Sequence, residues 1–172
     1  QECAVNTSEA FLELFKETPT LFTHVVHASE QEYTTLKKEG HTIIHCPISN
    51  RLLGNGALDL DAIESHQIKW ICGTDGLSSN YDLNLFEELK IALFMHKESE
   101  LLPLAKNLLD SVTVNAAKAL GLNTGIIEEG KNADLLVINL EEEPNEQLPI
   151  HLILHQYPIS EIYINGNLTE VN

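Results

Sequence analysis

The 172-residue sequence predicts an α/β fold. Three short apolar segments rich in β-branched residues alternate with segments of helical periodicity, and loops rich in Gly, Asn and Ser lie between them. Uniformly apolar strands are typical of parallel sheets, because helices cover both faces of such sheets. The alternation of strand and helix therefore indicates a series of parallel βα units.

The first part of the chain carries the three predicted strands. In chain order we expect a helix over 6–16, a strand over 20–26, a helix over 30–39, a strand over 42–46, a loop over 47–56, a helix over 58–65 and a strand over 68–72. Asn6 with Glu9 and Ser29 with Glu32 have the spacing of capping pairs, which sets the first two helix starts.

The second part of the chain changes character at Gly125. Before it we expect a loop over 73–80 and helices over 84–96, 100–109 and 112–120; after it we expect strands over 132–139, 161–164 and 168–171. Asn165-Gly166 is a strong signal for a two-residue hairpin turn. The sequence thus predicts two domains, residues 1–124 and a small β appendage over 125–172.

The composition excludes several classes of partner. Ten Lys and Arg against 26 Asp and Glu give a formal charge of −16, so phosphate backbones and anionic membranes would be repelled. No apolar stretch is long enough to span a bilayer. Three cysteines without CxxC spacing indicate neither a disulfide framework nor a structural zinc site, and they fit a reducing cytoplasm. The chain begins at Gln1 without Met, so a fragment, a processed product and a part of something longer are all open at this point.

Asp75 and His24 are the main candidates for chemistry. Functional groups of parallel βα folds lie at the carboxyl ends of strands, and both residues fall there. Gly73 and Gly76 would let the chain bend and present the Asp75 carboxylate, which could bind a divalent metal and accept a proton from water. The plainer alternatives are an Asp that forms a turn and a hydrogen-bonded His at a strand end. His27 would point to the other face of the strand.

Three polar side chains in the predicted loops could contact a substrate: Ser49, Asn50 and Ser78. Ordinary turn formation is the alternative for each of them.

Four motifs together resemble the amidohydrolase superfamily, in the branch that holds chlorohydrolases and S-adenosylhomocysteine-type deaminases. They are Thr23-His-Val-Val-His27, His45-Cys-Pro-Ile-Ser-Asn-Arg-Leu-Leu-Gly-Asn-Gly56, Gly73-Thr-Asp-Gly-Leu-Ser-Ser-Asn80 and Gly130-Lys-Asn-Ala-Asp134. Two further segments, 15–24 and 57–60, look most like the 6-aminodeoxyfutalosine deaminases of the futalosine route to menaquinone.

The resemblance implies a (β/α)8 barrel flanked by a small β-sandwich. It identifies the three strands as the sixth to eighth of the barrel and residues 125–172 as strands of the sandwich. His24 then matches the histidine that contacts the hydrolytic water, and Asp75 matches a ligand of zinc or iron that also accepts a proton. The family's HxH motif and its fifth-strand histidine have no match here, so the N-terminal half of the barrel is expected to be missing.

Three functions follow as hypotheses. The first is hydrolytic deamination of an aminopurine nucleoside, similar to 6-aminodeoxyfutalosine or S-adenosylhomocysteine, by a parent enzyme that could form a homo-oligomer. The second is displacement of chloride or an alkylamine from a triazine ring, with the same metal and the same Asp75. The third is an inactive fragment or scaffold, which the absent HxH motif favours.

Overall fold

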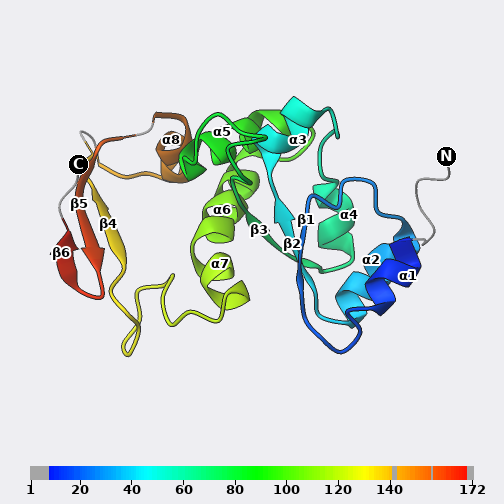
Figure 1. Ribbon diagram of the computed structural model, residues 1–172. Helices are drawn as coiled ribbons and strands as arrows, with labels where there is room; N and C mark the ends of the chain where they lie inside the picture. The colour runs from blue at the N-terminus through cyan, green and yellow to red at the C-terminus, as the bar shows by residue number, and fades with distance from the viewer. Residues whose placement is uncertain (1–7, 141–142, 156, 170–172) are drawn as a thin grey trace. The chain divides into compact units, whose positions relative to one another are not determined.

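A computed structural model describes residues 8–140, 143–155 and 157–169 (Figure 1). The chain forms two compact units, Gln1–Leu83 and Asn84–Asn172. In the described part of the chain, each unit holds one three-stranded sheet. The first unit carries the candidate site, and the predicted domain boundary after residue 124 remains a prediction.

The sheet of the first unit is parallel, with the strand order β1-β2-β3. Its strands are β1 (Leu21–Thr23), β2 (Thr42–His45) and β3 (Lys69–Cys72). In the central strand Ile43 is fully buried, and Ile44 pairs with Thr23 on one side and Ile71 on the other. The α/β prediction is confirmed, because apolar strands are paired in parallel and connected through helices.

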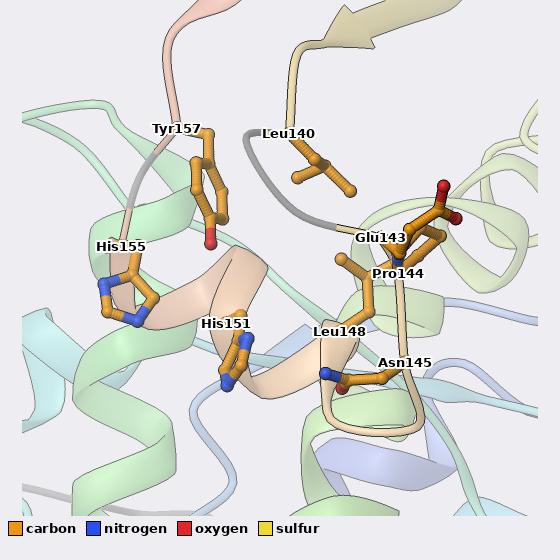
Figure 2. A pocket seen from close by; sticks show the side chains of 8 residues that line it. All are labelled: Leu140, Glu143, Pro144, Asn145, Leu148, His151, His155 and Tyr157. Atoms are coloured by element: carbon orange, nitrogen blue, oxygen red, sulfur yellow. The ribbon is translucent and has the colours of Figure 1, made fainter.

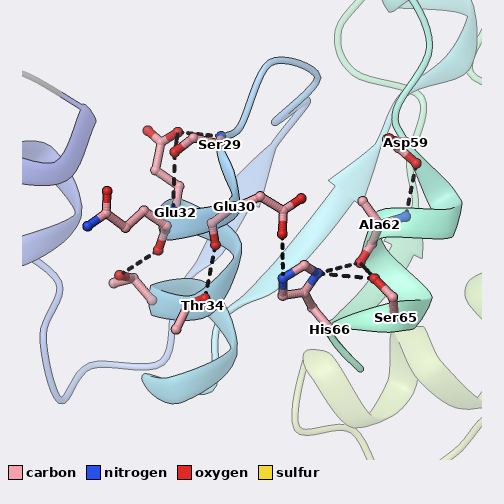
Figure 3. A network of polar contacts seen from close by, with 10 residues as sticks. Ser29, Glu30, Glu32, Thr34, Asp59, Ala62, Ser65 and His66 are labelled. Atoms are coloured by element: carbon pink, nitrogen blue, oxygen red, sulfur yellow. Dashed lines mark hydrogen bonds and ion pairs between the residues drawn. The ribbon is translucent and has the colours of Figure 1, made fainter.

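From residue 8 on, the first unit has four helices: α1 (Ser8–Glu13), α2 (Glu30–Lys38), α3 (Pro47–Leu53) and α4 (Leu60–Ser65). Figure 3 shows how two of them begin. Ser29 and Glu32 form the predicted capping box of α2, and the Asp59 side chain accepts from the backbone N–H of Ala62 at the start of α4. His66 Nε2 lies 3.1 Å from Glu30 Oε2, so a polar contact links the end of α4 to the start of α2.

Two expectations for this unit were wrong. Residues 47–53 were expected in a loop, yet they form α3, with Pro47 in the first turn and Gly54 as a left-handed C-cap. The first strand was expected to reach residue 26 but ends at Thr23, because His24 and Val25 adopt positive φ angles of 74° and 51°. The predicted cap at Asn6 lies outside the described residues.

The second unit combines helices with an antiparallel sheet. Its elements are α5 (Leu85–Met95), α6 (Leu101–Val112), α7 (Val114–Ala119), β4 (Leu135–Ile138), α8 (Leu148–His155), β5 (Ile159–Ile164) and β6 (Asn167–Thr169). Helix α6 packs against α5, α7 and α8, and Leu89, Leu108 and Ile153 are buried. None of the described helices is long and apolar enough to cross a membrane.

The hairpin prediction is confirmed, and one helix was missed. Asn165 and Gly166, with φ angles of 50° and 76°, connect β5 to β6. Residues after Gly125 were expected to be β structure, but α8 lies between β4 and β5. Its sequence is apolar almost throughout, so it carries no helical periodicity that would separate it from a strand.

Candidate active site

The carboxyl ends of β1, β2 and β3 lie at one edge of the parallel sheet and carry the candidate residues. His24 follows β1 directly, and its backbone N–H donates to the carbonyl of Ile44 at 2.9 Å. Ser49 and Asn50 lie in α3, which begins two residues after β2 ends. Asp75 follows β3 by three residues. The topology therefore brings together four polar side chains that follow the ends of three strands.

Asp75 is held by hydrogen bonds to both carboxylate oxygens. The hydroxyls of Ser49 and Ser79 donate to Oδ2 at 2.7 and 2.8 Å, and the N–H of Gly76 donates to Oδ1 at 2.8 Å. These bonds, that of Ser49 above all, hold the pKa of the Asp75 carboxyl below its usual range. Asp75 is consequently an ionised acceptor at neutral pH, and its side chain keeps 30% of its surface exposed.

The backbone around Asp75 is tightly defined. Asp75 has a φ of 58°, an uncommon conformation for a residue other than Gly. Two residues earlier, a Cβ on Gly73 would lie 2.9 Å from the Cγ2 of Ile44. Because Gly73 has no Cβ, the chain can pass close to Ile44 of β2 as it leaves β3. The turn that follows carries the Asp75 carboxylate.

His24 bridges Asn50 and Asp75. Its Nδ1 lies 2.8 Å from Asn50 Oδ1, and its Nε2 lies 3.6 Å from Asp75 Oδ2. The carbonyl oxygen of Asn50 can only accept, so the contact is a hydrogen bond in the tautomer that carries the proton on Nδ1, and Nε2 then faces Asp75. His27 is exposed.

The three predicted substrate contacts have different surroundings. Ser49 and Asn50 are fully buried, and their side chains contact Asp75 and His24. Ser78 is exposed, whereas its neighbour Ser79 bonds to Asp75. Ser79 was not among the predicted site residues. The spacing of Ser79 four residues after Asp75, in a Gly-rich turn, is the signal that could have identified it.

Asp75 has the character of a metal ligand. It is an ionised, partly exposed carboxylate whose orientation is fixed by three hydrogen bonds. Among residues 8–140, 143–155 and 157–169 there is no group of three or more His, Cys, Asp or Glu side chains that could hold a metal ion. Asp75 is the residue at this sheet edge that could bind a metal ion, and His24 lies beside it.

A separate pocket in the second unit has a volume of about 230 Å³ (Figure 2). Leu140, Leu148 and Tyr157 line it together with His151 and His155, whose ring centroids lie 5.5 Å apart along α8. None of the candidate residues at the sheet edge lines this pocket.

The model of the amidohydrolase family matches residues 5–169, nearly the entire chain. The chain belongs to the amidohydrolase family. This amidohydrolase is 50% identical over 164 residues to an aminodeoxyfutalosine deaminase from Nitratiruptor sp., covering 94% of the chain and 40% of that protein. The resemblance predicted from the motifs is thereby confirmed.

Solved structures agree with this assignment. An aminofutalosine deaminase from Helicobacter pylori, in complex with methylthio-coformycin, matches with a TM-score of 0.91 at 37% identity, over 96% of this amidohydrolase and 41% of that chain. A zinc-bound adenosine deaminase from Xanthomonas campestris matches with a TM-score of 0.78 at 29% identity, over 91% of this chain and 38% of that one. The amidohydrolase chain thus spans about two fifths of the length of these relatives.

Proposed function

We propose that the complete protein containing this chain is a metal-dependent hydrolase that removes the amino group from the adenine ring of a 5′-substituted nucleoside, with 6-aminodeoxyfutalosine as the first candidate substrate. The observation that carries the proposal is the placement of His24 Nε2 3.6 Å from Asp75 Oδ2, at the strand ends of an amidohydrolase fold. The names of the relatives, which are deaminases of aminodeoxyfutalosine, 5′-deoxyadenosine and adenosine, support the substrate class.

A divalent metal, zinc or iron, would supply Lewis acidity that lowers the pKa of water to near neutrality. Asp75 is the residue of this chain that would hold it, and the zinc bound by the Xanthomonas adenosine deaminase supports this part of the proposal. The remaining ligands would have to come from other parts of the complete protein, because a catalytic zinc site takes about three protein ligands.

The residues of this chain would handle the proton and the developing charge. Asp75 would accept the proton of the attacking water on its carboxylate, which its three donors keep ionised and oriented. His24 would accept a hydrogen bond from the water through Nε2, orient it toward the ring carbon and stay in contact with the tetrahedral centre that forms. The ring carbon would gain oxygen and lose ammonia, and the product would carry a carbonyl in place of the amino group.

The acidic surface is compatible with this chemistry. At a formal charge of −16, this chain would repel a polyanion, but an uncharged nucleoside feels little of that field. A small uncharged substrate therefore suits the charge of this chain better than nucleic acid or an anionic membrane does.

The test is an ammonia-release assay on the complete protein with 6-aminodeoxyfutalosine, 5′-deoxyadenosine, adenosine, S-adenosylhomocysteine and a chlorotriazine. We expect turnover of adenine nucleosides and none of the triazine. Turnover of the triazine alone, or of no compound by a folded, metal-loaded protein, would overturn the proposal.

Asp75→Asn is the matched variant for that assay. The amide keeps the shape of the side chain but lacks the charge that binds metal and accepts the proton, so turnover should fall by several orders of magnitude, on the order of 10³ or more. Circular dichroism should show an unchanged fold. Activity within about tenfold of the parent would contradict the role assigned to Asp75.

A further inference from the structure

We propose that Asn50 is a positioning residue that fixes the tautomer of His24, keeping the proton on Nδ1 and leaving Nε2 as a hydrogen-bond acceptor toward the reaction centre. This inference deepens the proposed function and rests on it. It concerns which atom of His24 can accept a proton or a hydrogen bond at the moment when water approaches.

The local hydrogen-bond geometry favours one tautomer. Nδ1 of His24 lies 2.8 Å from the Asn50 carbonyl oxygen, a distance typical of a good hydrogen bond. Nε2 lies 3.6 Å from Asp75 Oδ2, beyond hydrogen-bond length, and that oxygen already accepts from two serine hydroxyls. If the neutral ring carried its proton on Nε2 instead, the short bond from Nδ1 to Asn50 would be lost, and the contact from Nε2 to Asp75 is too long to replace it.

Asn50 is itself held rigidly enough to impose this choice. It is fully buried, and its backbone N–H donates to the carbonyl of Cys46 at 2.9 Å, in the first turn of α3. Its backbone carbonyl oxygen accepts from the backbone N–H of Asn55 at 2.9 Å. A side chain fixed at its base and enclosed by neighbours has few alternative rotamers, so its acceptor stays directed at His24.

His24 needs such a partner because its own backbone does not restrain the ring. The residue follows the end of β1 in a left-handed conformation, with a φ of 74°, and 31% of its side-chain surface is exposed. A ring in that position could rotate about its side-chain bonds. One hydrogen bond from Nδ1 fixes both the tautomer and the ring orientation, as a carbonyl or carboxylate partner does for histidines in many enzymes.

The same helix acts on the other reactive group. Ser49, the neighbour of Asn50, is also fully buried and donates to Asp75 Oδ2 at 2.7 Å. In this proposal the two residues support Asp75 and His24 from behind, and the direct contact with a substrate expected from the sequence stays a prediction.

The first measurement needs no variant of Asn50. Long-range proton–nitrogen NMR correlation on the complete, metal-loaded protein with ¹⁵N-labelled histidine reports which ring nitrogen carries the proton, and His24→Gln identifies the signals of His24. We expect a protonated Nδ1 and an unprotonated Nε2 at neutral pH. An Nε2–H tautomer in the parent protein would overturn the proposal.

The second measurement uses two variants of similar size. Asn50→Leu removes the acceptor, so we expect His24 to shift toward the Nε2–H tautomer and kcat to fall about 10- to 100-fold with KM nearly unchanged. Asn50→Asp keeps an acceptor at the same place, and it should retain the Nδ1–H tautomer and recover kcat relative to Asn50→Leu. Asn55→Asp, which adds a charge just after the same helix, is the control for charge alone.

The outcomes separate this inference from the proposed function. If His24→Gln lowers activity strongly while Asn50→Leu, folded by circular dichroism, leaves the tautomer and kcat unchanged, the positioning role fails and the deaminase proposal stands. If His24→Gln itself has no effect, the proposed mechanism fails. Should Asn50→Leu not fold, the parent tautomer and the result for Asn50→Asp still decide the matter.

Discussion

His24 and Asp75 are assigned to different tasks, so their substitutions should differ in one respect besides rate. Asp75 accepts three hydrogen bonds and carries the ionised carboxylate expected of a metal ligand. His24 only turns Nε2 toward that carboxylate, at 3.6 Å. The metal content of purified variants distinguishes the two roles, because loss of a metal ligand releases the metal and loss of a residue beside it does not.

For His24→Gln in the complete protein we expect turnover to fall by about 10²- to 10⁴-fold, because the group that assists proton transfer is lost. Metal analysis of the purified variant should give the same stoichiometry as the parent. Loss of the metal with this substitution would make His24 a ligand, and its assigned contact with water would be wrong.

His41 offers a test of how burial affects protonation away from the site. It is almost fully buried, its Nδ1 accepts from the N–H of Thr20 at 3.1 Å, and burial lowers the pKa of its ring below the usual value. Because the unfolded chain then binds a proton more readily than the folded one, stability should be full above the unfolded pKa of about 6.5 and decline as pH falls below it.

We therefore expect the thermal unfolding midpoint of the complete protein to drop between pH 7.5 and pH 5.5 by more than that of His41→Gln, which cannot titrate. Equal slopes for the two proteins over this range would show that His41 does not contribute to the pH dependence.

Gly125 and Gly130 form a matched pair after helix α7. Both have positive φ angles, 86° and 84°, but a Cβ on Gly125 would lie 2.7 Å from the Thr113 carbonyl oxygen and 2.7 Å from the Cβ of Ala117, while a Cβ on Gly130 would meet nothing within 4 Å. The pair separates the backbone effect of losing glycine from the steric effect of close packing.

Gly130→Ala should lower the free energy of unfolding by about 1 to 2 kcal/mol, the usual effect of a side chain in the left-handed region. Gly125→Ala should lower it by a further 1 to 3 kcal/mol or so, because the backbone at Thr113 would have to move. Denaturant unfolding of the two variants measures the difference, and equal losses would show that the loop after α7 can relax.

The elements that sequence predicts well are those with a local signal. The capping box of Ser29 and Glu32 and the β-branched run over 42–46 each lie within a few residues, and both gave the right element. Helix α3 was missed because Pro47, Ser49 and Gly54 are common both in turns and at helix ends, so composition alone leaves the choice open.

The candidate site could be predicted only in part, for a related reason. Asp75 and His24 were found because each follows an apolar strand. The bonds from Ser49 to Asp75 and from Asn50 to His24 each join residues 26 positions apart, and no local pattern encodes such a distance. They depend on the parallel register of β1, β2 and β3, which the fold supplies.

The isolated 172-residue chain is the subject of the last prediction. Its parallel sheet has only three strands in the described residues, so β1 and β3 each leave one edge without a strand partner there. Parallel strands are normally covered on all sides, and unpaired edges associate with other chains. We expect the isolated chain to oligomerise or aggregate, and to bind no stoichiometric metal and release no ammonia from aminopurine nucleosides.

Size-exclusion chromatography, metal analysis and the ammonia assay on the isolated chain check this expectation. Adding a fragment that supplies the strands of the remaining barrel should restore both metal binding and turnover. A monomeric, well-folded 172-residue protein that binds one metal ion tightly would contradict the assignment of its strands to an incomplete barrel.

Helix α3 links the two candidate reactive groups through its backbone. Ser49 and Asn50 are consecutive, so their Cα atoms are separated by one rigid peptide unit of about 3.8 Å. Ser49 donates to Asp75 Oδ2 and the side-chain oxygen of Asn50 lies 2.8 Å from His24 Nδ1, so a displacement of this one short helix acts on both sides of the 3.6 Å gap between Oδ2 and Nε2.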